Sequence, residues 1–203
     1  MNQDSPRETG NALGDGTRTP NSLTAASAVL YTDLDHTLHR SDAYRTKHGI
    51  IPGSPDTPFF EFANVLEQLL APFKEVVIVL STSWVQELGF EETRSRFPTA
   101  SLRARIVDST YHPGDELAPV WGYITRGAQV LRHVRHHRLT RWLAVDDDRQ
   151  GFDGYESHLI HCQRSVGLGD KDVQELFARR LELMFGTPDS LSSDVSPKPE
   201  CPR

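Results

Sequence analysis

Five short stretches of the chain are mostly apolar, without the regular polar alternation typical of a half-exposed strand. They lie at residues 28–32, 75–80, 105–107, 142–145 and 158–162. Continuous apolarity is what a strand buried on both faces requires, as in a parallel sheet covered by helices. The pattern therefore predicts five buried strands.

Helical periodicity fills most of the intervals between these strands. Apolar side chains at helical spacing predict helices over residues 58–70, 84–97, 127–137 and 170–185. Pro58 suits the first turn of the first of these helices. Strands that alternate with helices through short connections predict an α/β fold with an open, mostly parallel sheet.

The two ends of the chain are much less apolar than the middle. Residues 1–27 contain only six apolar side chains, and residues 187–203 contain four prolines and four serines. Such segments bury too little surface to offset the entropy lost on ordering. We therefore expect a disordered leader over residues 1–27, one domain over residues 28–186 and a disordered tail over residues 187–203.

Composition narrows the function classes. The 203 residues carry a formal charge of −6, which argues against a protein that coats nucleic acid through bulk positive charge. No stretch approaches the roughly 20 apolar residues of a membrane span, and the first residues lack the pattern of a secretory signal. Two cysteines make no disulfide framework and no zinc site. We expect a soluble, cytoplasmic protein without a membrane partner.

Three of the predicted strands end in polar groups that could share one ligand. Because the carboxyl ends of parallel strands meet at one edge of a sheet, these groups should lie close together. Clustered carboxylates repel one another without a cation, and oxygen ligands select a hard ion such as Mg²⁺, which leaves positions for a phosphate. The pattern predicts phosphoryl transfer. The groups are Asp33 and Asp35 after the first strand, Ser81 and Thr82 after the second, and Asp146, Asp147 and Asp148 after the strand at 142–145.

Each piece alone has a simpler explanation. An Asp-x-Asp pair is common, Ser81 and Thr82 could be helix caps, and residues 146–148 could form a solvated turn. An EF-hand loop starting at Asp33 is excluded, because its sixth position is Leu38 rather than glycine. No Walker loop and no Gly-x-Gly-x-x-Gly occurs, which disfavours a P-loop nucleotide hydrolase and a dinucleotide-binding protein. The occurrence of all three pieces after buried strands favours a site.

In this order the motifs resemble the haloacid dehalogenase (HAD) superfamily of phosphohydrolases with an aspartate nucleophile. More narrowly, the strings at 80–84, 105–110, 142–148 and 167–170 resemble the HAD domain of Swiss Army Knife RNA repair proteins. The resemblance covers nearly all of residues 28–185. It implies an α/β, HAD-like Rossmannoid fold of three layers with a mostly parallel central sheet and a minimal cap or none.

The resemblance also implies a role for each matching residue. Asp33 would be the nucleophile and a Mg²⁺ ligand. Asp35 would protonate the leaving group and activate water, while its backbone carbonyl binds the metal. Substrate contacts would come from Thr37, which stabilises the loop, and from Ser81 and Thr82 at the second strand end. Asp146 and Asp147 would complete the metal site. The activity implied is that of a Mg²⁺-dependent phosphatase that forms an aspartyl-phosphate.

The chain departs from the family pattern at two positions. His36 stands where glycine is usual, so a left-handed backbone there would cost about 1 kcal/mol; otherwise the ring could lie at the mouth of the site. The usual lysine before the fourth motif is missing, and Arg126 is our candidate for its role, with planar geometry in place of a point charge. Both departures leave open a second hypothesis, a catalytically weak HAD-like module that binds phosphorylated partners or nucleic-acid ends.

Two further segments bear on the substrate. Residues 39–57 form a loop-like stretch too short for a cap domain. Such a stretch indicates either an open site for a large substrate, such as a nucleic-acid end, or a disordered surface loop, and it counts against a mutase, which must exclude water.

A run of basic residues follows the start of the third predicted helix. Their spacing predicts a basic strip that contacts phosphates or is simply solvated. We expect His133 and His137 to face solvent, because no third metal ligand lies near them in the sequence, and Trp84 and Trp142 to lie in the core. The basic residues are Arg132, Arg135, Arg138 and Arg141.

Overall fold

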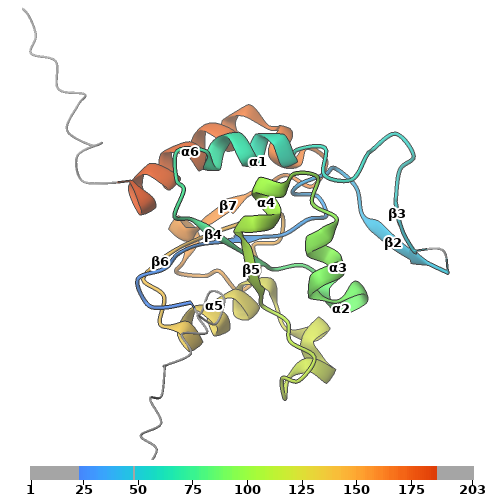
Figure 1. Ribbon diagram of the computed structural model, residues 1–203, viewed down its shortest axis with the longest axis horizontal. Helices are drawn as coiled ribbons and strands as arrows, with labels where there is room; N and C mark the ends of the chain where they lie inside the picture. The colour runs from blue at the N-terminus through green and yellow to red at the C-terminus, as the bar shows by residue number, and fades with distance from the viewer. Residues whose placement is uncertain (1–22, 48, 187–203) are drawn as a thin grey trace, which may run out of the picture.

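A computed structural model of the chain describes residues 23–47 and 49–186, and its centre is a five-stranded sheet (Figure 1). The strand order is β5-β4-β1-β6-β7, and every neighbouring pair is parallel. The α/β class and the parallel sheet predicted from the sequence are therefore confirmed. The strands are β1 Ala28–Thr32, β4 Val77–Leu80, β5 Ile106–Ser109, β6 Arg141–Asp146 and β7 Leu159–His161.

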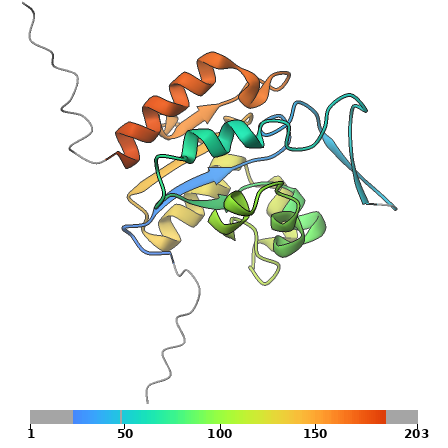
Figure 2. The same cartoon turned by 45° about the horizontal axis from the view of Figure 1, so that its top comes forward.

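Helices cover both faces of this sheet and make three layers (Figures 1 and 2). On one face α1, Ala63–Leu70, lies beside α6, Lys171–Phe185, and on the other lies α5, Arg126–His137. Successive side chains of β1 point to opposite faces of the sheet. Leu30 packs in the core beneath α1 and α6, and Tyr31 packs in the core beneath α5. This alternation explains why β1 had to be apolar throughout.

The other helical segments lie in two long connections. The chain between β4 and β5 forms α2, Trp84–Leu88, α3, Phe90–Ser95, and α4, Ala100–Arg105. The connection from β5 to α5 contains a six-residue 3₁₀ helix, Ala118–Tyr123. Neither α4 nor this 3₁₀ helix was expected from the sequence. In the described part of the chain, no helix is long and apolar enough to span a bilayer.

Two predicted helices differ from those observed. The helix expected over residues 58–70 begins only at Ala63, because Phe60 has a left-handed backbone (φ +59°) that no helical turn accommodates. The helix expected over residues 84–97 is divided at Gly89, whose φ of +84° ends α2. Both predictions of long helices were wrong at these points.

The loop-like stretch after the first motif contains a β-hairpin. Strand β2, Ala43–Thr46, pairs antiparallel with β3, Gly49–Pro52, and the hairpin projects from the body of the molecule (Figures 1 and 2). Arg45 ties it to α2, since its guanidinium donates to the backbone carbonyl and the carboxylate of Glu87. The segment is therefore not the irregular loop we expected, but it is a minimal insertion.

The domain boundaries remain predictions. Residues 1–22 of the expected leader and the whole expected tail, residues 187–203, lie outside the described residues. Residues 23–27 are described, and the carbonyl of Ala25 accepts a hydrogen bond from the backbone of Thr140 beside β6.

Candidate active site

The ends of three neighbouring strands carry the predicted site residues. Because β1 lies between β4 and β6, the residues that follow these strands become neighbours. Parallel pairing continues past the ends of β1 and β4: the backbone N–H of Asp33 donates to Val145 of β6 at 3.1 Å, and that of Ser81 donates to Thr32 of β1 at 2.9 Å. These two bonds place Asp33 between Ser81 and the acids at the end of β6.

Three carboxylates gather at this edge. Asp33 and Asp146 are buried, Asp147 is partly exposed, and one oxygen of each lies within 4.8 Å of the other two. We call these three residues the acid cluster. The carboxylate of Asp35 does not belong to it, so of the four predicted metal ligands Asp35 would contribute its backbone carbonyl.

The electrostatics of the acid cluster favour a bound cation. Burial raises the pKa of Asp33 to about 7, although Arg126 opposes the shift. Burial and the neighbouring Asp33 together raise the pKa of Asp146 well above its usual value, and burial raises the pKa of Asp147. Oxygen-only donors with this excess of negative charge fit Mg²⁺.

Two guanidiniums reach the acid cluster. The exposed Arg164 pairs with Asp147, and Arg126 reaches the two buried acids. Nη2 of Arg126 lies 3.3 Å from Oδ1 of Asp33 and its Nε 3.2 Å from Oδ2 of Asp146, so one guanidinium bridges two acids of the cluster. Burial works to lower the pKa of Arg126, but the surrounding carboxylates raise it more. The next residue makes this placement possible: a Cβ on Gly127 would lie 2.2 Å from the backbone of Gly151 in the loop after β6. Glycine therefore allows the start of α5 to approach the acids.

The carboxylate of Asp35 accepts hydrogen bonds through one of its two oxygens. The indole Nε1 of Trp84 donates to its Oδ1 at 3.1 Å, and Nε2 of His39 donates to the same oxygen at 2.9 Å. Within the described residues both hydrogen bonds to this carboxylate go to Oδ1, so Oδ2 is left for a ligand. Trp84 is buried as expected, yet it also contacts a predicted catalytic residue. His39 was not singled out from the sequence, although its spacing of four from Asp35 is a usable signal.

The predicted hydroxyl groups differ in their partners. The Oγ of Ser81 and the Oγ1 of Thr37 are buried and have no hydrogen-bond partner in the described part of the chain. The Oγ1 of Thr82 accepts a bond from the backbone of Trp84 at 3.4 Å and so serves the turn before α2. A buried hydroxyl without a partner is costly, so Ser81 next to Asp33 has capacity for a phosphoryl oxygen.

The comparisons with known proteins agree with this geometry. A family model described as the HAD domain in Swiss Army Knife RNA repair proteins matches residues 29–173. The chain belongs to this family. No curated protein and no solved structure matches it. The HAD fold expected from the motifs is thereby confirmed.

His36 of this HAD domain has the left-handed backbone that glycine normally provides. Its φ is +57°, the strained alternative considered above. Its ring is also used: Nδ1 donates to the carbonyl of Arg164 at 2.8 Å, and Nε2 donates to Asp42 at 2.9 Å. Burial works to lower the pKa of His36, but these acceptors raise it. The ring therefore links the loop after β7 to the base of the hairpin.

A pocket of about 280 Å³ opens beside Arg126 of the HAD domain. Tyr123, at the end of the 3₁₀ helix, stands on its rim with 92% of its surface exposed. Polar groups dominate the rest of the lining, so the pocket suits a hydrated, polar ligand rather than an apolar one. Its other polar side chains include Ser83, Gln86, Thr125, Asp148 and Gln150.

The predicted basic strip is not continuous. Only Arg132 and Arg135 lie on α5, since Arg138 is the left-handed residue that ends this helix and Arg141 begins β6. Arg132 forms an ion pair with Asp115 at 2.8 Å. His133 is only 6% exposed, so the expectation that it faces solvent was wrong.

Proposed function

We propose that this HAD domain is a Mg²⁺-dependent phosphohydrolase that acts through an aspartyl-phosphate on Asp33. The observation that carries the proposal is the placement of Asp33: it is buried at the end of the central strand, with Arg126 bridging it to Asp146. On the side of β4, Ser81 offers a hydroxyl that has no hydrogen-bond partner among the described residues. Nucleophile, positive charge and hydrogen-bond donor thus surround one point, as phosphoryl transfer requires.

In the first step a carboxylate oxygen of Asp33 attacks the phosphorus atom of a phosphate monoester. The bond between phosphorus and the ester oxygen breaks, and Asp35 gives its proton to the departing oxygen. Arg126 and the hydroxyl of Ser81 stabilise the charge on the phosphoryl oxygens. Mg²⁺ held by the acid cluster would supply further positive charge at the same place.

In the second step a water molecule attacks the phosphorus of the aspartyl-phosphate. Asp35, now ionised, takes a proton from this water, and the bond to Asp33 breaks to release inorganic phosphate. The bonds from Trp84 and His39 fix Oδ1 of Asp35, so the proton moves to and from Oδ2. Both residues are therefore positioning residues for Asp35.

The substrate that we propose is a phosphorylated nucleic-acid end. The insertion after the first motif is only a hairpin, so a large substrate can approach. The exposed ring of Tyr123 beside Arg126 offers a surface on which a terminal base can stack. The family is that of a domain in RNA repair proteins, which fits this class of substrate.

Phosphate release from p-nitrophenyl phosphate and from a 3′- or 5′-phosphorylated oligonucleotide tests the proposal. We expect Mg²⁺-dependent release by the wild type and by Asp153→Asn, which changes an exposed acid in the loop after β6, and none by Asp33→Asn. Asp35→Asn should form the phospho-enzyme from the activated ester but turn it over slowly, which intact-mass measurement detects.

Hydrolysis would be refuted if the wild type released no phosphate from any of these esters with several divalent metals. Retained binding of the phosphorylated oligonucleotide would then favour the non-catalytic module, in which Arg126 remains bound to Asp33 instead of releasing the nucleophile.

A further inference from the structure

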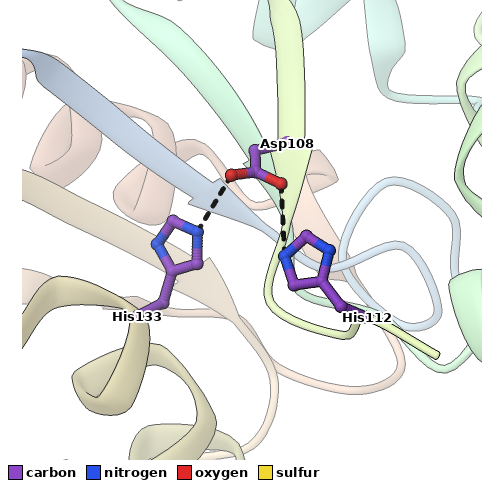
Figure 3. A group of neighbouring side chains, drawn as sticks. All are labelled: Asp108, His112 and His133. Carbon is purple, nitrogen blue, oxygen red and sulfur yellow. Dashed lines mark hydrogen bonds and ion pairs between the residues drawn. The ribbon is translucent and has the colours of Figure 1, made fainter. Parts of the chain in front are cut away.

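A second group of metal-ligand side chains lies further along α5 from Arg126, beside the edge strand β5. Asp108 of β5 points between His112, in the loop after this strand, and His133 of α5 (Figure 3). One ligand atom of each lies within 4.8 Å of the other two. His137, one turn further along α5, places its Nε2 4.0 Å from Oδ2 of Asp108. We call these four residues the histidine cluster.

The spacing within the histidine cluster is that of metal ligands. Nε2 of His112 lies 3.4 Å from Oδ1 of Asp108, and Nε2 of His133 lies 3.3 Å from its Oδ2. The contact with His133 is a long hydrogen bond, since charge-assisted hydrogen bonds are typically about 2.7–2.9 Å. Two ligand atoms of a tetrahedral ion with bonds of about 2.0–2.1 Å stand about 3.3–3.4 Å apart. The two imidazoles face different oxygens of the one carboxylate, at separations compatible with ligands of a single ion.

A buried hydroxyl orients one of the imidazole rings. The OH of Tyr31, in β1, lies 2.8 Å from Nδ1 of His133, and both residues are buried. Metal-bound histidines usually donate their second ring N–H to an oxygen of this kind, which fixes the ring and leaves the other nitrogen for the metal. Tyr31 thus points Nε2 of His133 toward Asp108.

We propose that Asp108, His112, His133 and His137 bind Zn²⁺ or a similar divalent transition-metal ion. Three imidazoles and one carboxylate complete a tetrahedral set, which is typical of zinc and unlike the oxygen-only set that Mg²⁺ prefers. The site shares no residue with the acid cluster, so the proposal does not depend on the proposed phosphohydrolase activity.

The ion would link the long segment between β5 and α5 to α5 and β5 themselves. His112 lies at the start of the segment between β5 and α5, and Asp115 of the same segment pairs with Arg132 of α5. Further along, this segment forms the 3₁₀ helix that carries Tyr123 to the rim of the pocket. Zinc at the histidine cluster would thus order one wall of the candidate active site without touching the substrate.

Metal retention by the full, tag-free chain tests the site. After chelation and reloading with Zn²⁺, we expect one zinc per chain to survive gel filtration, and Co²⁺ to give the visible absorption of a tetrahedral complex. His112→Ala should weaken Zn²⁺ binding by at least about a hundredfold, and His137→Gln should do the same. Both side chains are partly exposed, so these variants should fold normally.

Two control variants locate the ion. His136→Gln changes an exposed histidine of the same helix, and Asp33→Asn removes the charge of the acid cluster; both should keep the zinc. Hydrogen exchange in residues 110–117 should slow with zinc in the wild type but not in His112→Ala. Absence of retained zinc, equal zinc in His112→Ala and the wild type, or loss of zinc in Asp33→Asn alone would each overturn the proposal.

Discussion

The acid cluster and the histidine cluster each place a carboxylate at the end of a parallel strand, but the two carboxylates have opposite pKa shifts. Asp33 follows the central strand β1, and burial raises its pKa to about 7 even with Arg126 beside it. Asp108 lies on the edge strand β5, and hydrogen bonds from His133 and from the backbone of Ser109 hold its pKa below the usual value despite burial. The two pKa shifts differ in sign because Asp33 is buried beside other carboxylates, whereas Asp108 accepts hydrogen bonds from His133 and Ser109.

This difference determines which ion each cluster suits. In the acid cluster three carboxylates face two guanidiniums, Arg126 on Asp33 and Asp146 and the exposed Arg164 on Asp147, so negative charge is in excess and suits a hard cation. In the histidine cluster one carboxylate faces several imidazoles, so donors of intermediate softness surround a single charge. One edge of one sheet therefore suits two kinds of metal ion, because β1 lies beside the acidic end of β6 and β5 lies beside a histidine-rich helix.

Replacement of Arg126 should have the largest effect. Arg126→Ala should lower phosphate release by about a thousandfold or more, because no other guanidinium contacts both Asp33 and Asp146 in the described residues. Arg126→Lys should recover part of the rate, since lysine keeps the charge but loses the planar fork. Steady-state kinetics with p-nitrophenyl phosphate measure both.

The matched control is Arg135→Ala, which removes an exposed arginine from the same helix and should change neither rate nor zinc retention. A faster Arg126→Ala variant would reverse the interpretation, because it would mean that the ion pair restrains the nucleophile. Loss of zinc in Arg126→Ala would contradict the independence of the two clusters.

The pH dependence of stability should follow the raised pKa of Asp33. In metal-free protein this carboxyl is protonated between about pH 4 and pH 7 only when the chain is folded, so the folded state binds more protons there. The free energy of unfolding should therefore fall as pH rises toward and through 7, with about 2–3 kcal/mol lost between pH 5 and pH 8 from this source. Urea unfolding with a chelator present measures it.

Two comparisons test whether Asp33 causes this pH dependence of the unfolding free energy. Asp33→Asn should flatten the decline, whereas Asp153→Asn should follow the wild type. Addition of Mg²⁺ should restore stability at pH 8 more than at pH 5, because the ion binds the ionised carboxylates. Equal slopes for wild type and Asp33→Asn would show that the acid cluster does not carry the effect.

A smaller catalytic effect should follow from Trp84→Phe. This change removes the N–H that binds Oδ1 of Asp35 at 3.1 Å but keeps an aromatic ring against Phe59. We expect kcat to fall about tenfold with little change in KM, because Asp35 loses one of the two bonds that orient it. Phe59→Leu is the control: it disturbs the packing of Trp84 and keeps the bond, so a comparable fall in kcat there would remove the positioning role.

The sequence predicted the sheet well because its signal was local. Strand β1 is buried at every residue, and continuous apolarity at 28–32 is the direct imprint of that burial. The start of α1 could not be read in the same way, since the apolar stripe extends back to Phe59 while Phe60 adopts a left-handed turn. The hairpin was missed because Tyr44 and Ile51 are exposed, so no buried face left a period of two in the sequence.

The two clusters also differ in how far the sequence could predict which ligands lie together. Asp33 and Asp146 could be placed together because topology brings the ends of neighbouring parallel strands to one edge. His133 could not be assigned a partner, because Asp108 lies 25 residues away on a different element and only the packing of α5 beside β5 brings them together. The topology of parallel strands predicted the ligands at neighbouring strand ends, and no signal in the sequence marked the ligands that only the packing of a helix beside the sheet brings together.

The smallest effect should come from Tyr31, which contacts the histidine cluster and lies on the strand that leads to the acid cluster. Tyr31→Phe removes the hydroxyl 2.8 Å from Nδ1 of His133, two residues before Asp33. The change should cost about 1–2 kcal/mol of unfolding free energy and weaken Zn²⁺ binding about tenfold, because a buried ring loses the group that orients it. Phosphate release should change less than about twofold, since Asp33 keeps its backbone bond to Val145. The control is Tyr155→Phe on the exposed loop after β6. A parallel loss of zinc and of kcat in Tyr31→Phe would mean that the two clusters are coupled through β1.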